Sequence, residues 1–380
     1  MTKKLKKALT FFDHHVSCIS RRVHRVLSSI PQLQFVLFGL AMVIVGYIVY
    51  TGSSPGNINV LAIIMIYSMV ALGLNLLLGY GGLISLSTAP VMGLAAHGMR
   101  ILVVGEQFGQ VNYFLAIVIV LVLSVFMGLL IGLLSLKMEG IYLAIATLFF
   151  GYIIAELAGA FELFSYGQSA RMGAITFFGD TSLSWIHDIW TLYLIVVATV
   201  TLVVIGLYNI LKSPTGRAFM AISRSQHAAL AMGISVRRYR FLAFVISTVV
   251  AAIGGILYVT FRQRTGAFDS RWNLELSLIL LAIVVVGGLK SFFGMFLGAM
   301  IIIGIPEFYF ERIEAFIINR GWFGESFRML GFSDVFAGLM IVLAILFYPR
   351  GAIMIFYTLK AKLIALKQRK AGRDVSIDVE

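Results

Sequence analysis

Long apolar runs dominate this chain and constrain its fold more than any other feature. Each run is close to the roughly 20 residues with which an α-helix crosses about 30 Å of hydrocarbon. Helices also satisfy their own backbone hydrogen bonds where no water is present. Ten such runs occur, at residues 35–50, 58–78, 83–104, 113–136, 141–158, 189–211, 241–261, 274–286, 292–310 and 335–348. The pattern predicts an all-α polytopic membrane protein with about ten transmembrane helices.

Composition excludes the other broad classes of protein. Hydrophobic residues make up 60% of the chain and charged residues only 12%, whereas a soluble domain is about half apolar and about a quarter charged. Intrinsic disorder requires low hydrophobicity, so a disordered protein is excluded as well. Cys18 is the only cysteine, so neither an intrachain disulfide nor a cysteine-based metal site is expected.

The positions of the basic residues test the number of spans. Lysine and arginine gather on the cytoplasmic side of membrane proteins, and an even number of spans puts both termini on one side. With both termini cytoplasmic, 22 of the 30 lysines and arginines fall inside. One span more or fewer would move part of this set outside. The net charge of +13 therefore indicates orientation and attraction to anionic lipid rather than binding of nucleic acid.

The two ends of the chain flank a predicted membrane domain at residues 34–357. Residues 1–33 place an apolar side chain at every third or fourth position, with lysine, arginine and histidine between them, which predicts a basic amphipathic cytoplasmic helix. This helix could lie in the plane of the membrane, contact a partner subunit, or simply extend the first span. Residues 358–380 are predicted to form a basic cytoplasmic tail.

A cluster of glycines predicts a break at the end of the second span. The sequence Gly79-Tyr80-Gly81-Gly82 has almost no polar residue on either side, so the break should lie at membrane depth. Irregular backbone is tolerated there where it is buried in protein or lines a cavity, and broken helices often form transport pathways. A tight turn or close helix packing explains the glycines equally well.

A second glycine pair repeats the same short motif. Gly287-Gly288 opens the form Gly-Gly-Leu-x-Ser, as Gly81-Gly82 does, and in the ten-span arrangement both pairs follow a span that runs inward. A duplicated architecture and a chance match are both open, because the chain contains 37 glycines.

The connection at residues 212–240 is the longest clearly cytoplasmic loop and is rich in charge. A short surface helix is predicted at 217–232, because Pro214 precedes it and Gly233 follows it. Small residues in its second half would allow a partner to approach closely, and a solvated basic loop is the alternative. The residues in question are Ala228, Ala229, Ala231 and Gly233.

Few ionisable residues fall within the apolar runs. A charge at the centre of a bilayer costs at least about 2.5 kcal/mol, so such residues are functional candidates. Glu156, Glu275 and Glu307 lie near the ends of spans and could reach the interface. Asn75 lies deeper, among leucines, and needs a hydrogen-bond partner or water. We therefore expect Asn75 to matter more for a transport path than any carboxylate.

Catalytic signatures are missing from the sequence. The segment Gly288-Leu289-Lys290-Ser291 lacks the glycine directly before lysine that a P-loop requires, so no ATP binding of that kind is expected. No His-Glu-x-x-His motif is present. The sequence therefore predicts a transport protein rather than an enzyme, with no metal or cofactor bound by this chain.

Five ordered blocks of sequence resemble one family of transport proteins. Residues 72–86, with the pattern Leu-Gly-Leu-Asn-Leu-Leu-Leu-Gly-Tyr-Gly-Gly-Leu-Ile-Ser-Leu, resemble the opening of LivM-type permeases. These are the membrane subunits of bacterial branched-chain amino acid ABC importers. Similar blocks follow at 140–148, 216–234, 242–258 and 284–299, and Tyr348-Pro349-Arg350-Gly351 closes the match.

The resemblance implies a heteromeric importer in the bacterial inner membrane. Its other parts would be a LivH-like permease, two ATPase subunits of the LivG and LivF kind that bind the ATP, and a periplasmic substrate-binding protein. The loop at 212–240 becomes the element that docks an ATPase, through Gly216, Arg217, Ala228, Ala229 and Gly233. The expected substrate path involves Asn75, Tyr80, Gly81, Gly82, Tyr152, Glu156, Gly287 and Gly288.

Several positions depart from the family pattern and leave the substrate open. Residues 85–91 read Ser-Leu-Ser-Thr-Ala-Pro-Val, where the family usually has Ser-Leu-Gly-His-Ala-Ala-Phe. Tyr152 takes the place of a family glutamate, with Glu156 one helical turn later on the same face. The loop carries Arg224, Gln226 and Leu230 in place of acidic residues. A urea or short-chain amide permease is the alternative within transport, and a stand-alone channel or ion-coupled carrier is the alternative outside the family.

Overall fold

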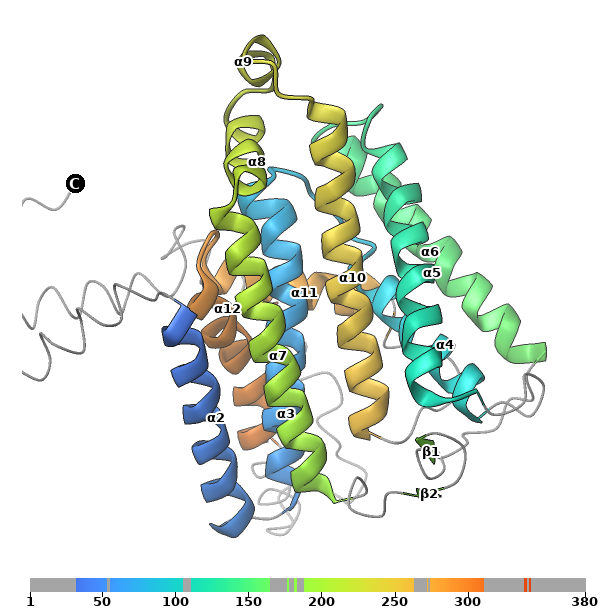
Figure 1. Cartoon of the computed structure of the whole chain (residues 1–380), viewed down its shortest axis with the longest axis vertical. Helices are drawn as coiled ribbons and strands as arrows, with labels where there is room; N and C mark the ends of the chain where they lie inside the picture. The colour runs from blue at the N-terminus through green and yellow to red at the C-terminus, as the bar shows by residue number, and fades with distance from the viewer. Residues whose placement is uncertain are drawn as a thin grey trace, which may run out of the picture.

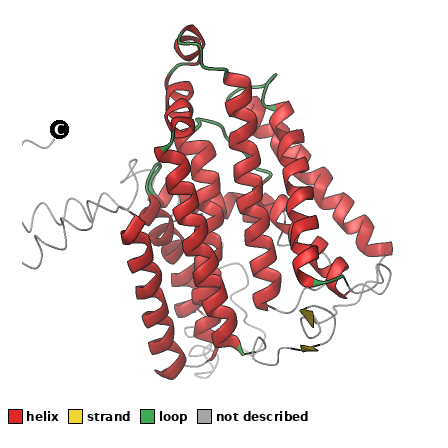
Figure 2. Ribbon diagram, in the orientation of Figure 1, coloured by secondary structure: helices red, strands yellow, loops and turns green. Residues whose placement is uncertain are grey.

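Most of the described chain is helical (Figure 2). The computed structural model describes residues 32–52, 55–104, 111–164, 176–177, 181–182, 188–262, 272, 274–310, 338–339 and 342. Two antiparallel strands of two residues each, β1 (Thr176–Phe177) and β2 (Thr181–Ser182), lie in the connection after the fifth apolar run. The all-α prediction therefore holds for the described bundle of helices but not for this connection.

Each of the first nine apolar runs corresponds to a described helix. They are α2 (Gln32–Gly52), α3 (Pro55–Asn75), α4 (Thr88–Val104), α5 (Tyr113–Leu134), α6 (Ile141–Phe164), α7 (Ile189–Lys212), α10 (Val236–Arg262), α11 (Leu274–Gly287) and α12 (Phe292–Ala299). The π-helix η1 (Leu76–Tyr80) continues α3, and η5 (Met300–Gly304) and η6 (Pro306–Phe310) follow α12.

Five helices of the described part are long and apolar enough to cross a membrane: Gln32–Gly52, Asn57–Tyr80, Tyr113–Leu134, Ile189–Lys212 and Val236–Arg262. Shorter apolar helices cover Ile141–Leu157, Leu274–Gly287 and Phe292–Gly304. Most of the tenth run, almost all of residues 1–33 and the tail at 358–380 lie outside the described residues. The total of ten spans and the side of the termini therefore stay predictions.

One end of the bundle gathers the basic connections (Figure 1). The turns after α3, α5 and α11 lie toward this end, together with α8 (Pro214–Arg224) and α9 (Gln226–Ala231). Contacts tie them together, since Tyr80 bonds to Lys290 and Arg240 bonds to Ser135. The basic loop 212–240 lies at this end, which the positive-inside rule therefore predicts to face the cytoplasm; we call it the cytoplasmic end.

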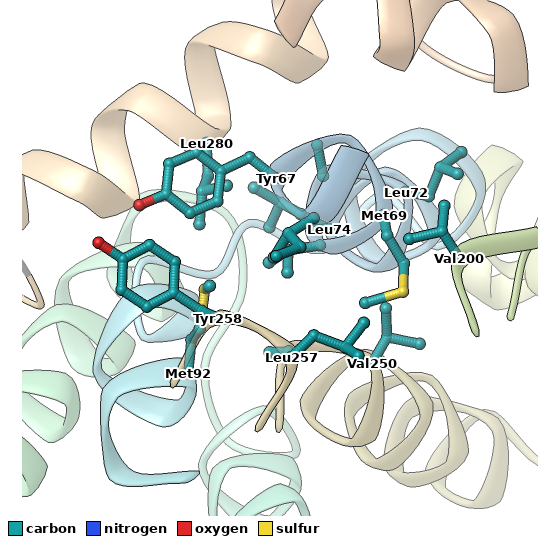
Figure 3. Packing of buried hydrophobic residues seen from close by; sticks show 14 of the residues in the cluster. Tyr67, Met69, Leu72, Leu74, Met92, Val200, Val250, Leu257, Tyr258 and Leu280 are labelled. Atoms are coloured by element: carbon teal, nitrogen blue, oxygen red, sulfur yellow. The ribbon is translucent and has the colours of Figure 1, made fainter. Parts of the chain in front are cut away.

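The core lies between α3, α4 and α10, with α7 and α11 beside it (Figure 3). Glycines allow close approach of these helices, since a Cβ on Gly255 would lie 2.1 Å from the carbonyl oxygen of Met92. The rings of Tyr67 and Tyr258 stack with centroids 6.2 Å apart. The most apolar window of the α3 span is 89% buried, against 17% for α2. The first helix therefore leaves most of its surface for lipid or a partner.

The predicted helix break is present after α3. The helix ends at Tyr80, residues 81–87 form no regular structure, and α4 begins only at Thr88. The third predicted span, which started at residue 83, is thus wrong at its beginning. The reason is local: Gly82 has a φ of +66°, and Pro90 suits only the first turn of a helix because it lacks an N–H. The chain returns into the bundle as irregular backbone.

Candidate functional site

Asn75 holds the second glycine turn in place. It is 1% exposed, its Oδ1 accepts from the backbone N–H of Lys290 at 3.0 Å, and its Nδ2 donates to the carbonyl of Ser291 at 3.4 Å. The Tyr80 hydroxyl donates to the carbonyl of Lys290 at 2.8 Å. Both residues were predicted to line a substrate path. Their described polar contacts instead link α3 and η1 to the turn between α11 and α12.

The glycine pairs serve turn geometry and close packing. Gly82 and Gly288 have φ angles of +66° and +93°, a region that glycine enters without steric cost. A Cβ on Gly287 would lie 2.3 Å from the carbonyl oxygen of Gly294, and one on Gly81 would lie 2.8 Å from that of Leu77. The second glycine of each Gly-Gly-Leu-x-Ser motif is therefore left-handed, but the motifs differ at the fourth position, where Lys290 has a φ of +66° and Ile84 has no positive φ.

Removing the Asn75 amide should destabilise the fold. In Asn75→Ala two backbone groups of the turn lose their partner, and a buried unsatisfied group costs about 1–3 kcal/mol. We expect a lower unfolding temperature in detergent, measured by thermal shift, with the helical content of the folded state unchanged. Gly206→Ala is the matched control, since a Cβ there meets nothing within 4 Å. An unchanged unfolding temperature in Asn75→Ala would contradict the structural role.

Side-chain hydroxyl groups accept hydrogen bonds from backbone N–H groups of the irregular segment after the glycine turn and of the first turn of α4. The N–H of Leu86 donates to Thr147 Oγ1 of α6 at 3.0 Å, and that of Ala89 donates to Ser277 Oγ of α11 at 3.3 Å. Thr147 and Ser277 are buried, and the sequence analysis missed both. A lone hydroxyl in an otherwise apolar run was the available signal. Such groups let backbone leave the helix at membrane depth.

Buried ionisable groups in α4 were missed as candidates as well. His97 and Arg100 are both buried, and each makes polar interactions within the chain. Arg100 is a positive charge inside a predicted span, which marks it as a functional candidate. The signal was present in the sequence, but only carboxylates were considered there.

One face of α6 is exposed along its length. The residues on it follow a spacing of three and four and are Tyr142, Ile145, Phe149, Tyr152 and Glu156. Tyr152 and Glu156 lie one helical turn apart on this face, within reach of each other. At 1.5 Å per residue, Glu156 lies roughly 22 Å from the start of the helix. Glu156 is the last residue but one of the apolar stretch Ile141–Leu157, so two polar side chains mark this end of an otherwise apolar exposed face.

The eight predicted path residues therefore form two groups. Asn75, Tyr80 and the four glycines lie at the turns of the cytoplasmic end. Tyr152 and Glu156 lie together on the exposed face of α6, which packs mainly on α4 and α5. The second group lies on the surface of the described part of the chain.

The predicted helix in the loop 212–240 is two helices rather than one. Ser225 interrupts it with extended backbone, φ −160° and ψ 116°, and its Oγ accepts from the N–H of Ala228 at 3.3 Å. Serine favours such a cap because its side chain competes for backbone groups. The buried face of α8 carries Ala218, Phe219 and Ile222. The α9 helix projects beyond the bundle (Figure 1).

The predicted docking residues divide into buried and exposed ones. A Cβ on Gly216 would lie 2.1 Å from the carbonyl oxygen of Leu211, so this glycine forms the turn from α7 into α8. Ala229 is buried. Arg217, Ala228 and Gly233 are exposed. Gly233 ends α9 at a φ of +78°, as a helix C-terminus requires.

Two apolar side chains next to Gly233 were missed as docking candidates. Leu230 is 55% exposed and Met232 is 83% exposed. Leu230 lies in α9 and Met232 is the C-cap of this helix. Other apolar residues of the loop, such as Phe219 and Ile222, are buried, so the sequence alone did not single these two out. Large apolar groups left in water indicate an interaction site.

Sequence comparison relates most of the chain to known transport proteins. A family model described as the permease component of a branched-chain amino acid transport system matches residues 56–345. The permease protein LivM of the high-affinity branched-chain amino acid transport system of Escherichia coli is 28% identical over 323 residues, 78% of this chain and 70% of that protein. LivM of Salmonella typhimurium is 28% identical over 340 residues, covering 83% and 74% of the two chains.

A sugar permease is also similar. The fructose import permease protein FruF of Bifidobacterium longum is 28% identical over 246 residues, 62% of this chain and 65% of that protein. No solved structure matches the chain.

Proposed function

The chain belongs to the family of permease components of branched-chain amino acid transport systems, and from this premise we propose that it forms the translocation path for branched-chain amino acids in an ATP-driven importer. The observation that carries the proposal is the family match, which spans the helices from α3 to η6. The two LivM relatives cover more of the chain than FruF does, which favours amino acids over sugars as cargo.

The exposed face of α6 supports a path shared with a second permease. Its apolar residues suit the aliphatic side chain of the substrate, and the Tyr152–Glu156 pair supplies the polar groups. A site of this kind is largely apolar with a few placed polar groups that orient the ligand. The partner that covers the face is, in this proposal, a LivH-like permease in the bacterial inner membrane.

The helices α8 and α9 support the proposal that ATP hydrolysis by partner subunits powers transport. The chain has no P-loop, so ATP is bound and hydrolysed by LivG- and LivF-like subunits, and this chain binds no cofactor. The exposed apolar residues of α9 offer them a docking surface. Closure of the ATPase pair then biases the helices between outward and inward arrangements. A periplasmic binding protein delivers the substrate.

Uptake by the complete complex tests the substrate. Proteoliposomes containing both permeases and both ATPases, supplied with the cognate binding protein, should accumulate labelled leucine when ATP is present on the ATPase side. Isoleucine and valine should compete, whereas fructose and urea should not. The similarity to FruF makes fructose the alternative cargo. ATP-dependent uptake of fructose in place of leucine would overturn the proposed substrate.

A further inference from the structure

A buried arginine joins both ends of the connection between α5 and α6. Arg240 of α10 is 4% exposed. Its Nη1 donates to the carbonyl of Ser135 at 2.7 Å, and its Nη2 donates to Glu139 Oε1 at 2.8 Å. Charge-assisted hydrogen bonds of this length are among the stronger ones in proteins. The connection is therefore fixed to the cytoplasmic end of α10.

Glu139 also faces α9, the helix proposed to dock an ATPase. Gln226 and His227 lie close enough to Glu139 for both to interact with its carboxylate. The hydrogen bond from Arg240 is the main reason why the pKa of Glu139 lies below its usual range, and Gln226 and His227 act in the same direction. Glu139 is thus ionised at neutral pH and contacts α9 and α10 at once.

The residue after Glu139 can act as a pivot. Gly140 has a φ of +59°, a Cβ there would meet nothing within 4 Å, and α6 begins at the next residue. An open cavity of about 600 Å³ lies along the start of this helix. Its lining residues are Lys137, Met138, Glu139, Tyr142, Ile145, Ala146 and Phe149. The first turns of α6 therefore have room to move when Glu139 is displaced.

We propose that Glu139 is the positioning residue that transmits movement of α9 to α6, through its contacts with Gln226 and Arg240 and with Gly140 as the pivot. The inference rests on the proposed function, because it requires an ATPase that acts on α9. The helix α9 packs on α8 and α10. Among the described residues, α9 is therefore linked to the start of α6 through Glu139. The side chain of Glu139 is 63% exposed, and ion pairs that reach solvent contribute little to stability. Its main effect is then on coupling.

Neutralising Glu139 tests this role in the complete complex. In Glu139→Gln we expect ATP hydrolysis and co-purification of the ATPases to persist, while substrate taken up per ATP hydrolysed falls at least about tenfold, within the usual range of coupling effects. Glu139→Asp keeps the charge and should recover part of the ratio. Lys137→Gln removes a charge two residues away in the same connection and should leave the ratio unchanged.

A pair of glycine variants, one at the pivot and one elsewhere as its control, tests the role of Gly140. Gly140→Ala places a side chain at a positive φ and should lower uptake per ATP, whereas Gly206→Ala, inside α7 and equally open, should not. An unchanged ratio in Glu139→Gln would overturn the proposal. The proposal would also be overturned if uptake by Glu139→Gln fell together with loss of the ATPases or with loss of thermal stability. That result indicates a structural role. Absence of ATP-dependent uptake in the unmodified complex would instead remove the proposed function itself.

Discussion

Replacing Leu230 and Met232 together with aspartate is expected to release the ATPase subunits from the permease. Both side chains are exposed at the cytoplasmic end on or beside α9. Central apolar anchors of an interface contribute about 2 kcal/mol or more each, and 1.4 kcal/mol corresponds to a tenfold change in affinity. Two such anchors together contribute about 4 kcal/mol, so affinity for the ATPase pair should fall about 700-fold, measured by co-purification at graded concentrations of the ATPases.

The control for this experiment is Met138→Asp. Met138 is an exposed methionine at the same end of the molecule, in the α5–α6 connection, and it lies outside α8 and α9. Its replacement should leave the ATPases bound. Full retention of the ATPases by the Leu230→Asp, Met232→Asp variant would show that α9 is not the docking surface, and the exposed apolar residues would then need another partner.

Replacing Glu156 with leucine is expected to abolish most uptake while leaving the permease folded. The carboxylate is exposed on α6, one helical turn from Tyr152, so leucine removes a polar group of the proposed path without breaking a buried contact of this chain. Loss of a charge-assisted hydrogen bond to a substrate costs about 1.5–3 kcal/mol, which corresponds to more than a tenfold loss of uptake. Labelled leucine uptake by the complete complex measures it.

Two further variants distinguish a role of these residues in the substrate path from a role in side-chain packing. Tyr152→Phe keeps the ring and removes the hydroxyl, so its uptake should lie between that of the unmodified chain and that of Glu156→Leu. Leu157→Ala changes an adjacent exposed residue of α6 and should have little effect on uptake. Normal uptake by Glu156→Leu, together with a higher unfolding temperature, would indicate that Glu156 faces lipid or its headgroups and lies outside the path.

The spans and the helix break were predictable because they depend on local composition. Apolar length predicts a helix wherever water is absent, and nine of the ten predicted runs coincide with helices in the described residues. Gly82 marks the break because only glycine enters its backbone region without cost. The start of α4 was placed too early, since apolar residues such as Leu83 occur in irregular buried backbone as well as in helices.

The partners of polar residues were not predictable, because they come from segments far apart in the chain. Asn75 was expected to need a hydrogen-bond partner, and it has one, but Lys290 lies 215 residues away. Thr147 and Ser277 serve backbone groups of another helix, which periodicity does not reveal. Leu230 and Met232 became candidates only when the fold showed that nothing covers them among the described residues.

The central claim is that this chain transports only when partner subunits hydrolyse ATP. The most direct measurement is leucine uptake into proteoliposomes that contain either this chain alone or the complex of two permeases and two ATPases, each with and without ATP. Uptake by the complex with ATP, and by none of the other three samples, is the predicted result. Uptake by this chain alone, with or without ATP, would contradict the claim and identify a stand-alone channel or carrier.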